Sequence, residues 1–200
     1  MGAVAPSKDG LKLVYTYDDD GDGLGVLTIE DVESGSFSYI EDVGGDSVFW
    51  SEDSAVLFYD VVDDVTGQPL DIYRHIDGQN PALDEVVFSA RQYNGSMVAK
   101  ATLSNDGQFL IFYNQGISSN EIYILPMAEA ATGSPSLAVA HQPDVLAYLE
   151  HNSGQFYLLT NLNAVLFNLL VVPDSSSLPL DISLATVLLP VLPLQTRVFF

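Results

Sequence analysis

The chain has 200 residues, of which 48% are apolar, so it is long enough to form one domain with a substantial core. It carries 27 acidic and only 6 basic residues, for a net charge of −21. This balance argues against nucleic acid as a partner, because phosphate binding needs clustered Lys and Arg. The sequence contains no Cys, which excludes disulfides and thiolate metal sites.

Short apolar and aromatic segments separated by turn residues predict strands along most of the chain. In chain order, we expect strands at 11–18, 25–32 and 37–40; at 46–51, 55–63, 70–77 and 84–90; at 97–104, 108–115, 120–127 and 135–140; and at 144–150, 155–161 and 164–173. No segment has sustained helical periodicity. Met127 to Thr132 is compatible with one helical turn, which Gly133 and Pro135 would end.

One turn phrase recurs between an apolar strand and an aromatic one. Its copies are Ser7-Lys8-Asp9-Gly10, Ser51-Glu52-Asp53-Ser54, Ser104-Asn105-Asp106-Gly107 and the more divergent His151-Asn152-Ser153-Gly154. The eighth position after each start is Tyr15, Tyr59, Phe112 and Leu159. A repeat of about 45 residues is typical of a propeller blade. We therefore predict an all-β chain that forms a partial β-propeller of three to four four-stranded antiparallel blades, at approximately 5–45, 46–96, 97–143 and 144–173.

The segment from 174 to 200 lacks this phrase. It is apolar and contains Pro190 and Pro193, and its apolar run is too short for a membrane helix. We expect a poorly ordered tail, with an unusual final strand as the alternative.

The acidic run Asp18-Asp19-Asp20-Gly21-Asp22-Gly23 matches the first half of a calcium loop. The pattern then requires Glu six positions after Gly23, where the chain has Ile29, and Glu30 comes one place late. A shorter propeller-type loop would need an acid at Val26. An acidic hairpin loop is the preferred interpretation.

Catalytic motifs are also incomplete. A serine hydrolase commonly needs Gly-x-Ser-x-Gly, and the nearest segment, 116–120, lacks the closing Gly. His75, His141 and His151 fall in separate units and match no zinc spacing, so we expect structural roles for them. Trp50 is predicted to pack between blades, and Ser51 and Asp53 to form a structural turn. We assign no catalytic, cofactor-binding or metal-binding residue and expect no cofactor. Asn94-Gly95-Ser96 fits a glycosylation acceptor but is interpreted as an ordinary turn.

Residues 5–173, taken in order, resemble the N-terminal propeller of the prolyl oligopeptidase family, and of its oligopeptidase B branch in particular. The resemblance is carried by Ser7–Tyr15, Val26–Gly35, Val48–Ser54, Ile72–His75, Ser118–Tyr123 and Phe156–Asn161. It implies a seven-bladed propeller joined to an α/β-hydrolase domain with a Ser-Asp-His triad, which the propeller covers. No position here matches the nucleophile turn, so no catalytic residue is transferred.

The resemblance implies a truncated, non-catalytic propeller segment of a serine-type peptidase. In the full-length protein it would act as a lid and size filter for peptide substrates, with the catalytic domain and peptides as partners. The alternative is a free-standing propeller that binds a protein or peptide, or a decayed paralogue with no peptidase role. Exposed edge strands would allow self-association. We expect a cytoplasmic location, without nucleic acid or membrane partners.

Overall fold

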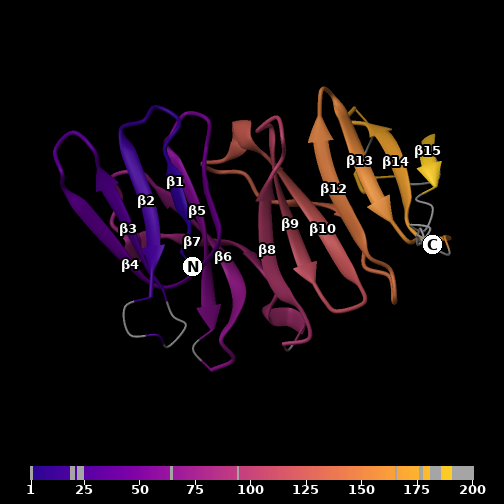
Figure 1. Ribbon diagram of the computed structural model, residues 1–200, viewed down its shortest axis with the longest axis horizontal. Coiled ribbons are helices and arrows are strands. Elements are labelled where there is room, and N and C mark those ends of the chain that lie inside the picture. Colours follow the sequence, from indigo (N-terminus) through magenta and orange to yellow (C-terminus); the bar gives the residue numbers. More distant parts are fainter. Residues whose placement is uncertain are drawn as a thin grey trace, which may run out of the picture.

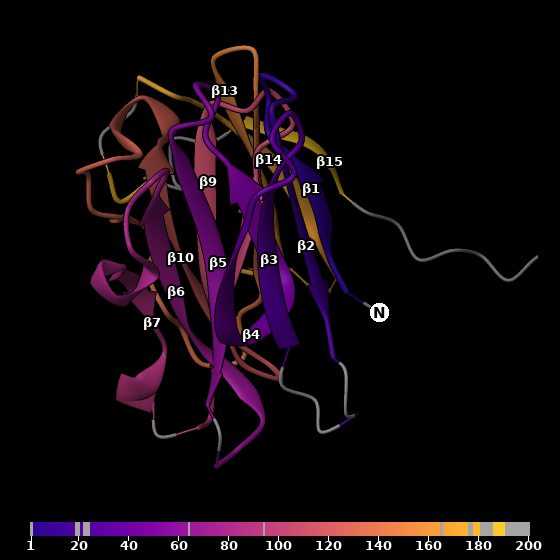
Figure 2. The ribbon, with the colours of Figure 1, turned by 90° about the vertical axis from the view of Figure 1, so that its left-hand side faces the viewer.

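Strands make up nearly all of the regular structure, as the apolar segments predict. The computed structural model describes residues 2–18, 21, 25–63, 65–93, 95–164, 166–175, 178–180 and 186–190, with the backbone alone at 45, 46 and 186–190. The described strands form antiparallel sheets of seven, four and four strands. These sheets stand face to face in a curved row (Figure 1), and Figure 2 looks along the row from its first end. The prediction of an all-β partial propeller is confirmed.

The strands group into blades in chain order. Blade 1 contains β1 (Val4–Pro6), β2 (Lys12–Tyr17), β3 (Gly25–Asp31) and the first half of β4 (Phe37–Trp50). Blade 2 contains the second half of β4, β5 (Val56–Asp63), β6 (Gln68–Ile76) and β7 (Glu85–Ser89). Blade 3 contains β8 (Val98–Leu103), β9 (Phe109–Gln115), β10 (Asn120–Pro126) and β11 (Ser136–Val139). Blade 4 contains β12 (Ala147–Asn152), β13 (Gln155–Thr160), β14 (Asn168–Pro173) and β15 (Thr186–Pro190).

Blades 1 and 2 share one long strand, β4. Its first half pairs with β3, from Glu30 opposite Phe37 onward, and its second half pairs with β5. Val43 has a partner on both sides, Gly25 in β3 and Val61 in β5. The blade boundary expected between residues 45 and 46 therefore falls inside a continuous strand, and this explains why the first sheet has seven strands.

The hydrophobic core is divided into clusters that lie between neighbouring blades. The side chains at their centres are Leu27, Trp50 and Leu57 between blades 1 and 2; Phe58, Leu110 and Phe112 between blades 2 and 3; and Ile122, Phe156 and Leu158 between blades 3 and 4. Each cluster takes residues from two blades, so face-to-face packing of blades is the main source of apolar burial.

Burial along the strands follows from this arrangement. In β5 the first five residues, Val56 to Asp60, are all buried, because blades 1 and 3 cover both faces of blade 2. In β12 buried and exposed residues alternate strictly, because only blade 3 covers blade 4 among the described residues. A strand with one covered face shows this period of two.

The connections contain only short helical segments. These are the 3-10 turns η1 (Pro81–Leu83), η2 (Arg91–Tyr93) and η3 (Met127–Glu129), the last of which falls at the helical turn allowed for Met127 to Thr132. No helix within the described ranges is long and apolar enough to cross a membrane.

Two further strands lie outside the strand ranges predicted from the sequence. Val4–Pro6 pairs with β2 to complete blade 1, and Thr186–Pro190 pairs with β14 at the far edge of blade 4. The latter belongs to the segment for which a poorly ordered tail was expected, with an unusual final strand as the alternative. Residues 176–177, 181–185 and 191–200 of that segment lie outside the described residues.

The shared strand predicts a strong effect of a small substitution. A Cβ atom at Gly44 would overlap the carboxylate of Asp60, which is fully buried and accepts the Ser47 N–H at 2.8 Å. Gly44→Ala should therefore lower the free energy of unfolding by about 3 kcal/mol, measured by chemical denaturation.

Gly78→Ala is the matched control, since Gly78 has φ +78 and open space around its Cα. It should cost only about 1 kcal/mol of left-handed strain. An equal loss in the two variants would contradict the assigned packing at β4.

Candidate functional site: the turn end of the arc

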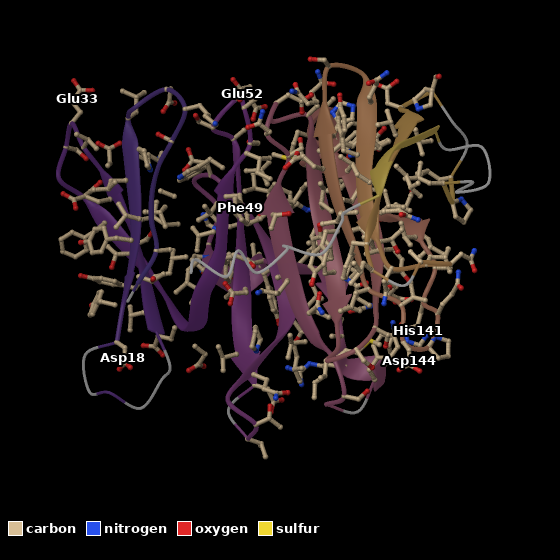
Figure 3. All side chains as sticks on the ribbon, turned by 45° about the vertical axis from the view of Figure 1, so that its right-hand side comes forward. Asp18, Glu33, Phe49, Glu52, His141 and Asp144 are labelled. Carbon is tan, nitrogen blue, oxygen red and sulfur yellow. The ribbon has the colours of Figure 1, made fainter. Side chains whose placement is uncertain are left out.

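The connections between strands lie on two opposite sides of the arc, at the two ends of the strands. We call the end that carries the repeated turns (7–10, 51–54, 104–107 and 151–154) the turn end. The opposite end, with the β2–β3 hairpin and the segment that joins blades 3 and 4, is called the link end. Figure 3 shows Glu33 and Glu52 at the turn end, and Asp18, His141 and Asp144 at the link end.

The repeated turn is held by a fixed set of hydrogen bonds. In the second copy, the Ser51 hydroxyl donates to Asp53 Oδ1 at 2.6 Å, and the Ala55 N–H donates to the same oxygen at 3.1 Å. The Val56 N–H donates to Ser51 Oγ at 2.9 Å. The first and third copies repeat all three bonds. The Ser and Asp side chains therefore define the turn, as predicted for Ser51 and Asp53.

The last turn residue has a left-handed backbone in these copies, with φ of 74° at Gly10, 60° at Ser54 and 71° at Gly107. Glycine adopts this conformation without strain, which explains its recurrence. Ser54 compensates by accepting the Asp9 N–H on its hydroxyl at 3.1 Å, and this bond ties the turn of blade 2 to that of blade 1.

The fourth turn differs from the expected alignment. His151 pairs with Phe156, as Trp50 pairs with Leu57, so His151 holds the strand position of Trp50 and is not the counterpart of Ser51. His151 and Phe156 are separated only by residues 152–155, whereas Trp50 and Leu57 are separated by residues 51–56. The sequence alignment placed Leu159 at the position of Tyr59 and Phe112. Because the hairpin is shorter, Leu158 holds that position instead, and it is part of the core between blades 3 and 4.

Trp50 and His151 occupy the same place, and both contact the preceding blade through a polar atom. Trp50 is buried and its indole N–H donates to the Ala5 carbonyl oxygen at 3.2 Å, which agrees with its predicted packing role. His151 is completely buried, and its Nδ1 lies 2.8 Å from Asp106 Oδ2 in the turn of blade 3. Its Nε2 lies 3.5 Å from Asp174 Oδ2. His151 thus contacts carboxylates from two blades.

Burial would raise the pKa of Asp106, but the contact with His151 and the hydrogen bonds from the Gln108 N–H and the Ser104 hydroxyl outweigh it. The net result is a pKa below the ordinary value for an aspartate. Asp106 is therefore ionised at neutral pH. The Asn105 N–H donates to Glu150 at 2.8 Å, which adds a further hydrogen bond between blades 3 and 4.

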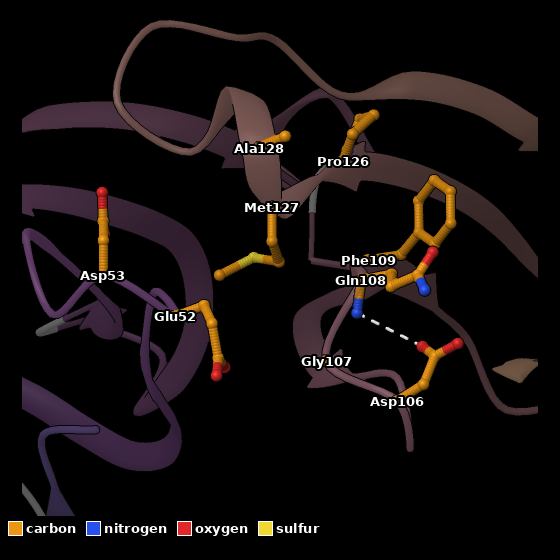
Figure 4. A pocket seen from close by; sticks show the side chains of 9 residues that line it. All are labelled: Glu52, Asp53, Asp106, Gly107, Gln108, Phe109, Pro126, Met127 and Ala128. Atoms are coloured by element: carbon orange, nitrogen blue, oxygen red, sulfur yellow. Dashed lines mark hydrogen bonds between the residues drawn. The ribbon is translucent and has the colours of Figure 1, made fainter. Parts of the chain in front are cut away.

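A pocket of about 660 Å³ opens between the turns of blades 2 and 3 (Figure 4). Its lining comprises Glu52, Asp53, Asp106, Gly107, Gln108, Phe109, Pro126, Met127 and Ala128. Hydrogen bonds from Ser51 and the Ala55 N–H hold the pKa of Asp53 below its usual range, so Asp53 and Asp106 are both ionised. The lining includes no serine, cysteine or histidine, so it lacks the nucleophile and the imidazole base of a hydrolase. Its carboxylates lie beside apolar side chains, and this combination suits a cation with an apolar part.

The other two histidines lie away from this pocket. His75 is buried, and its Nδ1 lies 2.9 Å from Asp84 Oδ1, while the Tyr59 hydroxyl donates to Asp84 Oδ2 at 2.9 Å. Burial, followed by the nearby Asp84 charge, raises the pKa of Tyr59 far above its ordinary value. This closed network supports the structural role expected for His75.

His141 makes a contact that the sequence spacing did not reveal. Its Nε2 lies 3.1 Å from Ser119 Oγ at the exposed link end. Catalysis by such a pair needs a third group that orients the imidazole. Asp144 instead accepts from Ser118 at 3.3 Å. Among the described residues, the pair therefore lacks the orienting carboxylate of a triad.

The acidic run at 18–23, which matches only the first half of a calcium loop, lies mostly outside the described residues, because Asp19, Asp20, Asp22 and Gly23 are not among them. At its start, Asp18 Oδ1 accepts the Gly21 N–H at 2.7 Å. Within the described part of the chain, no three acidic or histidine side chains are grouped as a metal ion would require. Asn94 of the glycosylation triplet is also outside the described residues.

Comparison with known proteins gives a consistent result. The family model for the prolyl oligopeptidase N-terminal β-propeller domain matches residues 1–181. Oligopeptidase B from Trypanosoma brucei, solved with covalently bound antipain, matches 94% of this chain at 23% identity with a TM-score of 0.80. Oligopeptidase B from Leishmania major matches 93% at 19% identity with a TM-score of 0.75. No curated protein matched the chain.

A more distant structure, prolyl oligopeptidase B from Galerina marginata, matches 94% of the chain at 15% identity with a TM-score of 0.68. The matched region is only 26% of the Trypanosoma and Leishmania chains and 28% of the Galerina chain. This chain therefore spans about a quarter of the length of these solved structures.

The contact between Asp106 and His151 predicts a specific response to acid. The pKa of Asp106 in the folded chain is below its value of about 3.9 in the unfolded chain. The ionised Asp106 therefore stabilises the fold above about pH 3.9, and this stabilisation is lost as the pH falls through the folded-state pKa. Asp106→Asn should cost about 1–2 kcal/mol at neutral pH and flatten the loss of stability below about pH 4.

Asp9→Asn is the matched control, since Asp9 makes the same turn bonds with Ser7 and Leu11 but has no histidine partner among the described residues. Thermal unfolding from pH 7 to pH 2.5 measures both variants. A larger effect at Asp9 than at Asp106 would contradict the role assigned to His151.

Proposed function

Because the chain belongs to the prolyl oligopeptidase family through its N-terminal β-propeller domain, we propose that it is the non-catalytic propeller segment of an oligopeptidase B-like serine peptidase. The family match over residues 1–181 carries this proposal. The partner is an α/β-hydrolase catalytic domain, and the cytoplasm is the proposed location.

The proposed role of the propeller is that of a lid and size filter for peptide substrates. A lid must keep its shape while it covers an active site, because sequestration from water and from large substrates depends on a fixed boundary. Apolar clusters between all successive blades support this role, since they make the arc a continuous packed body. Folded proteins would be excluded by their size, and short peptides admitted.

The charge of the chain favours basic peptides among those substrates. Acidic residues outnumber basic ones by 27 to 6, and a surface of one sign raises the rate at which oppositely charged ligands are captured. The carboxylates that line the turn-end pocket place part of this negative charge at the turn end. This attraction acts at long range and is weakened by salt.

A free-standing binding module is the second candidate, and the turn-end pocket is the observation that favours it. Its combination of carboxylates with Met127 and Phe109 suits a basic peptide segment. The transcript sequence beyond the codon for Phe200 discriminates between the candidates. A reading frame with further blades and a Gly-x-Ser-x-Gly turn supports the peptidase segment, whereas a stop codon supports the binding module.

The purified 200-residue chain should not cleave fluorogenic Arg or Lys peptides. The described Ser119–His141 contact lacks an orienting carboxylate, and the sequence contains no nucleophile turn. Hydrolysis is measured beside a Ser119→Ala variant. Activity that the wild type shows and this variant loses would overturn the non-catalytic assignment.

In a full-length enzyme that contains this segment, replacing Asp18, Asp19, Asp20 and Asp22 by Asn should lower kcat/KM for Arg and Lys peptides about threefold at low salt. The physical reason is the loss of long-range attraction, so the effect should fade in high salt. A neutral peptide is the matched control and should be unaffected. Equal loss for both peptides would reject the electrostatic part of the proposal.

A further inference from the structure

The repeated turns of neighbouring blades are hydrogen-bonded to each other at two of the three junctions. Between blades 1 and 2, the Asp9 N–H donates to the Ser54 hydroxyl at 3.1 Å. Between blades 3 and 4, the Ser153 N–H donates to Asp106 Oδ2 at 3.3 Å. Among the described residues, no hydrogen bond joins the turn of blade 2 to the turn of blade 3. The turn-end pocket opens at this junction.

The internal repeat explains why this junction is open. Ser54 is the last residue of its turn, and Gly107 holds the same position in the turn of blade 3. The bond between blades 1 and 2 depends on the Ser54 hydroxyl, and glycine has no side chain with which to repeat it. Apart from its chain neighbours, the nearest atom to a Cβ at Gly107 would be Glu52 Oε2, at 3.8 Å. The Glu52 carboxylate of blade 2 therefore reaches toward the open space beside the turn of blade 3.

The two walls of the pocket are acidic. Glu52 and Asp53 come from blade 2 and Asp106 from blade 3, so carboxylates stand on both sides of the opening (Figure 4). No basic residue is among those that line the pocket. Lys8 lies 3.9 Å from Glu52, but both side chains are largely exposed, so this ion pair holds Glu52 only weakly. The negative charge of the pocket is therefore available to a ligand.

Apolar side chains complete the pocket. Met127 is buried and lies between the two acidic walls in the view of Figure 4. Phe109 is half-buried, and its ring is held by the rings of His151 and Phe156, whose centroids lie 4.6 and 5.1 Å away. A cation on a long apolar stem satisfies both the carboxylates and this surface. A guanidinium suits it better than an ammonium, because its planar fork pairs with carboxylates in several directions and stacks on aromatic rings.

We propose that the turn-end pocket binds the side chain of an arginine residue in a peptide, with the guanidinium paired with Glu52 and the alkyl stem packed on Met127. This inference deepens the peptide-binding part of the proposed function, on which it rests. The volume of about 660 Å³ is usual for a ligand pocket and exceeds what one arginine side chain fills, so the adjoining peptide groups also fit. Blades 2 and 3 are each covered on both sides by other blades of the arc, so further blades would leave the pocket walls in place.

An NMR titration of the isotope-labelled chain with capped peptides tests the proposal. The amide resonances of Gly107 and Gln108 report binding at the pocket itself. Acetyl-Gly-Arg-Gly-amide should bind at least about tenfold more tightly at low salt than the matching citrulline peptide, because citrulline has the same shape without the charge. Equal affinity for the two peptides would overturn the proposal, and so would binding that shifts neither resonance.

Two substitutions of equal charge separate the pocket from the general acidity of the surface. Glu52→Gln should weaken binding of the arginine peptide about three- to fivefold, and the exposure of Glu52 makes the change safe for the fold. Glu33→Gln is the matched control, since Glu33 is an exposed acid at the turn end outside the pocket (Figure 3). It should leave the affinity unchanged. Equal weakening by the two variants would reduce the binding to long-range attraction and overturn the site.

Gly107→Ser tests the open junction directly. It supplies the hydroxyl that Ser54 supplies between blades 1 and 2, at a similar backbone φ of 71° against 60°, and should weaken the arginine peptide about tenfold by filling the pocket. Unchanged affinity in this variant would contradict the assigned site.

Butylguanidinium carries the side-chain group without a peptide and should bind more weakly than the arginine peptide. Equal affinity would make a free alkylguanidinium the occupant and overturn the proposal. The peptidase assignment is tested separately by the transcript beyond Phe200. A chain that fails to bind arginine but continues into further blades and a hydrolase domain would therefore reject this site alone.

Discussion

Face-to-face packing of sheets is the interaction on which this structure depends. A four-stranded blade cannot bury its own apolar faces, so each blade becomes stable only against its neighbours. The buried residues accordingly form clusters between blades, and β5 and β9 are covered on both sides. Stability is shared along the row, as it is in repeat proteins, and the loss of one junction exposes two faces at once.

Polar groups supplement this packing at the turn end. Trp50 bonds to the Ala5 carbonyl, the Asp9 N–H bonds to Ser54, and His151 reaches Asp106. These bonds join neighbouring blades at the same level of each repeat. The repeated turn therefore has two roles, because it closes its own hairpin and fixes the position of the next blade. The Ser and Asp side chains of the turn hold the backbone through hydrogen bonds.

Much of the architecture was predictable because strand alternation and turn residues are local signals. The strands from Phe109 to Gln115 and from Gln155 to Thr160 were placed within one residue of their observed ends. The fourth turn was misaligned because its hairpin is two residues shorter, and sequence similarity to the other turns concealed the change of register. The short strand Val4–Pro6 depends on pairing with β2, and the Ser119–His141 contact depends on loops distant in sequence, so neither leaves a local signal.

The strand shared by blades 1 and 2 has a mechanical consequence. The strand β4 runs from one blade into the next, with a register shift between Val43 and Val48, whereas no strand is shared between blades 2 and 3 or between blades 3 and 4 among the described residues. Changing the angle between the first two blades would require breaking backbone hydrogen bonds. At the other two junctions, rotation needs only side chains to slide and loop torsions to change. The shared strand should therefore restrain the angle between the first two blades more than loops restrain the other two junctions.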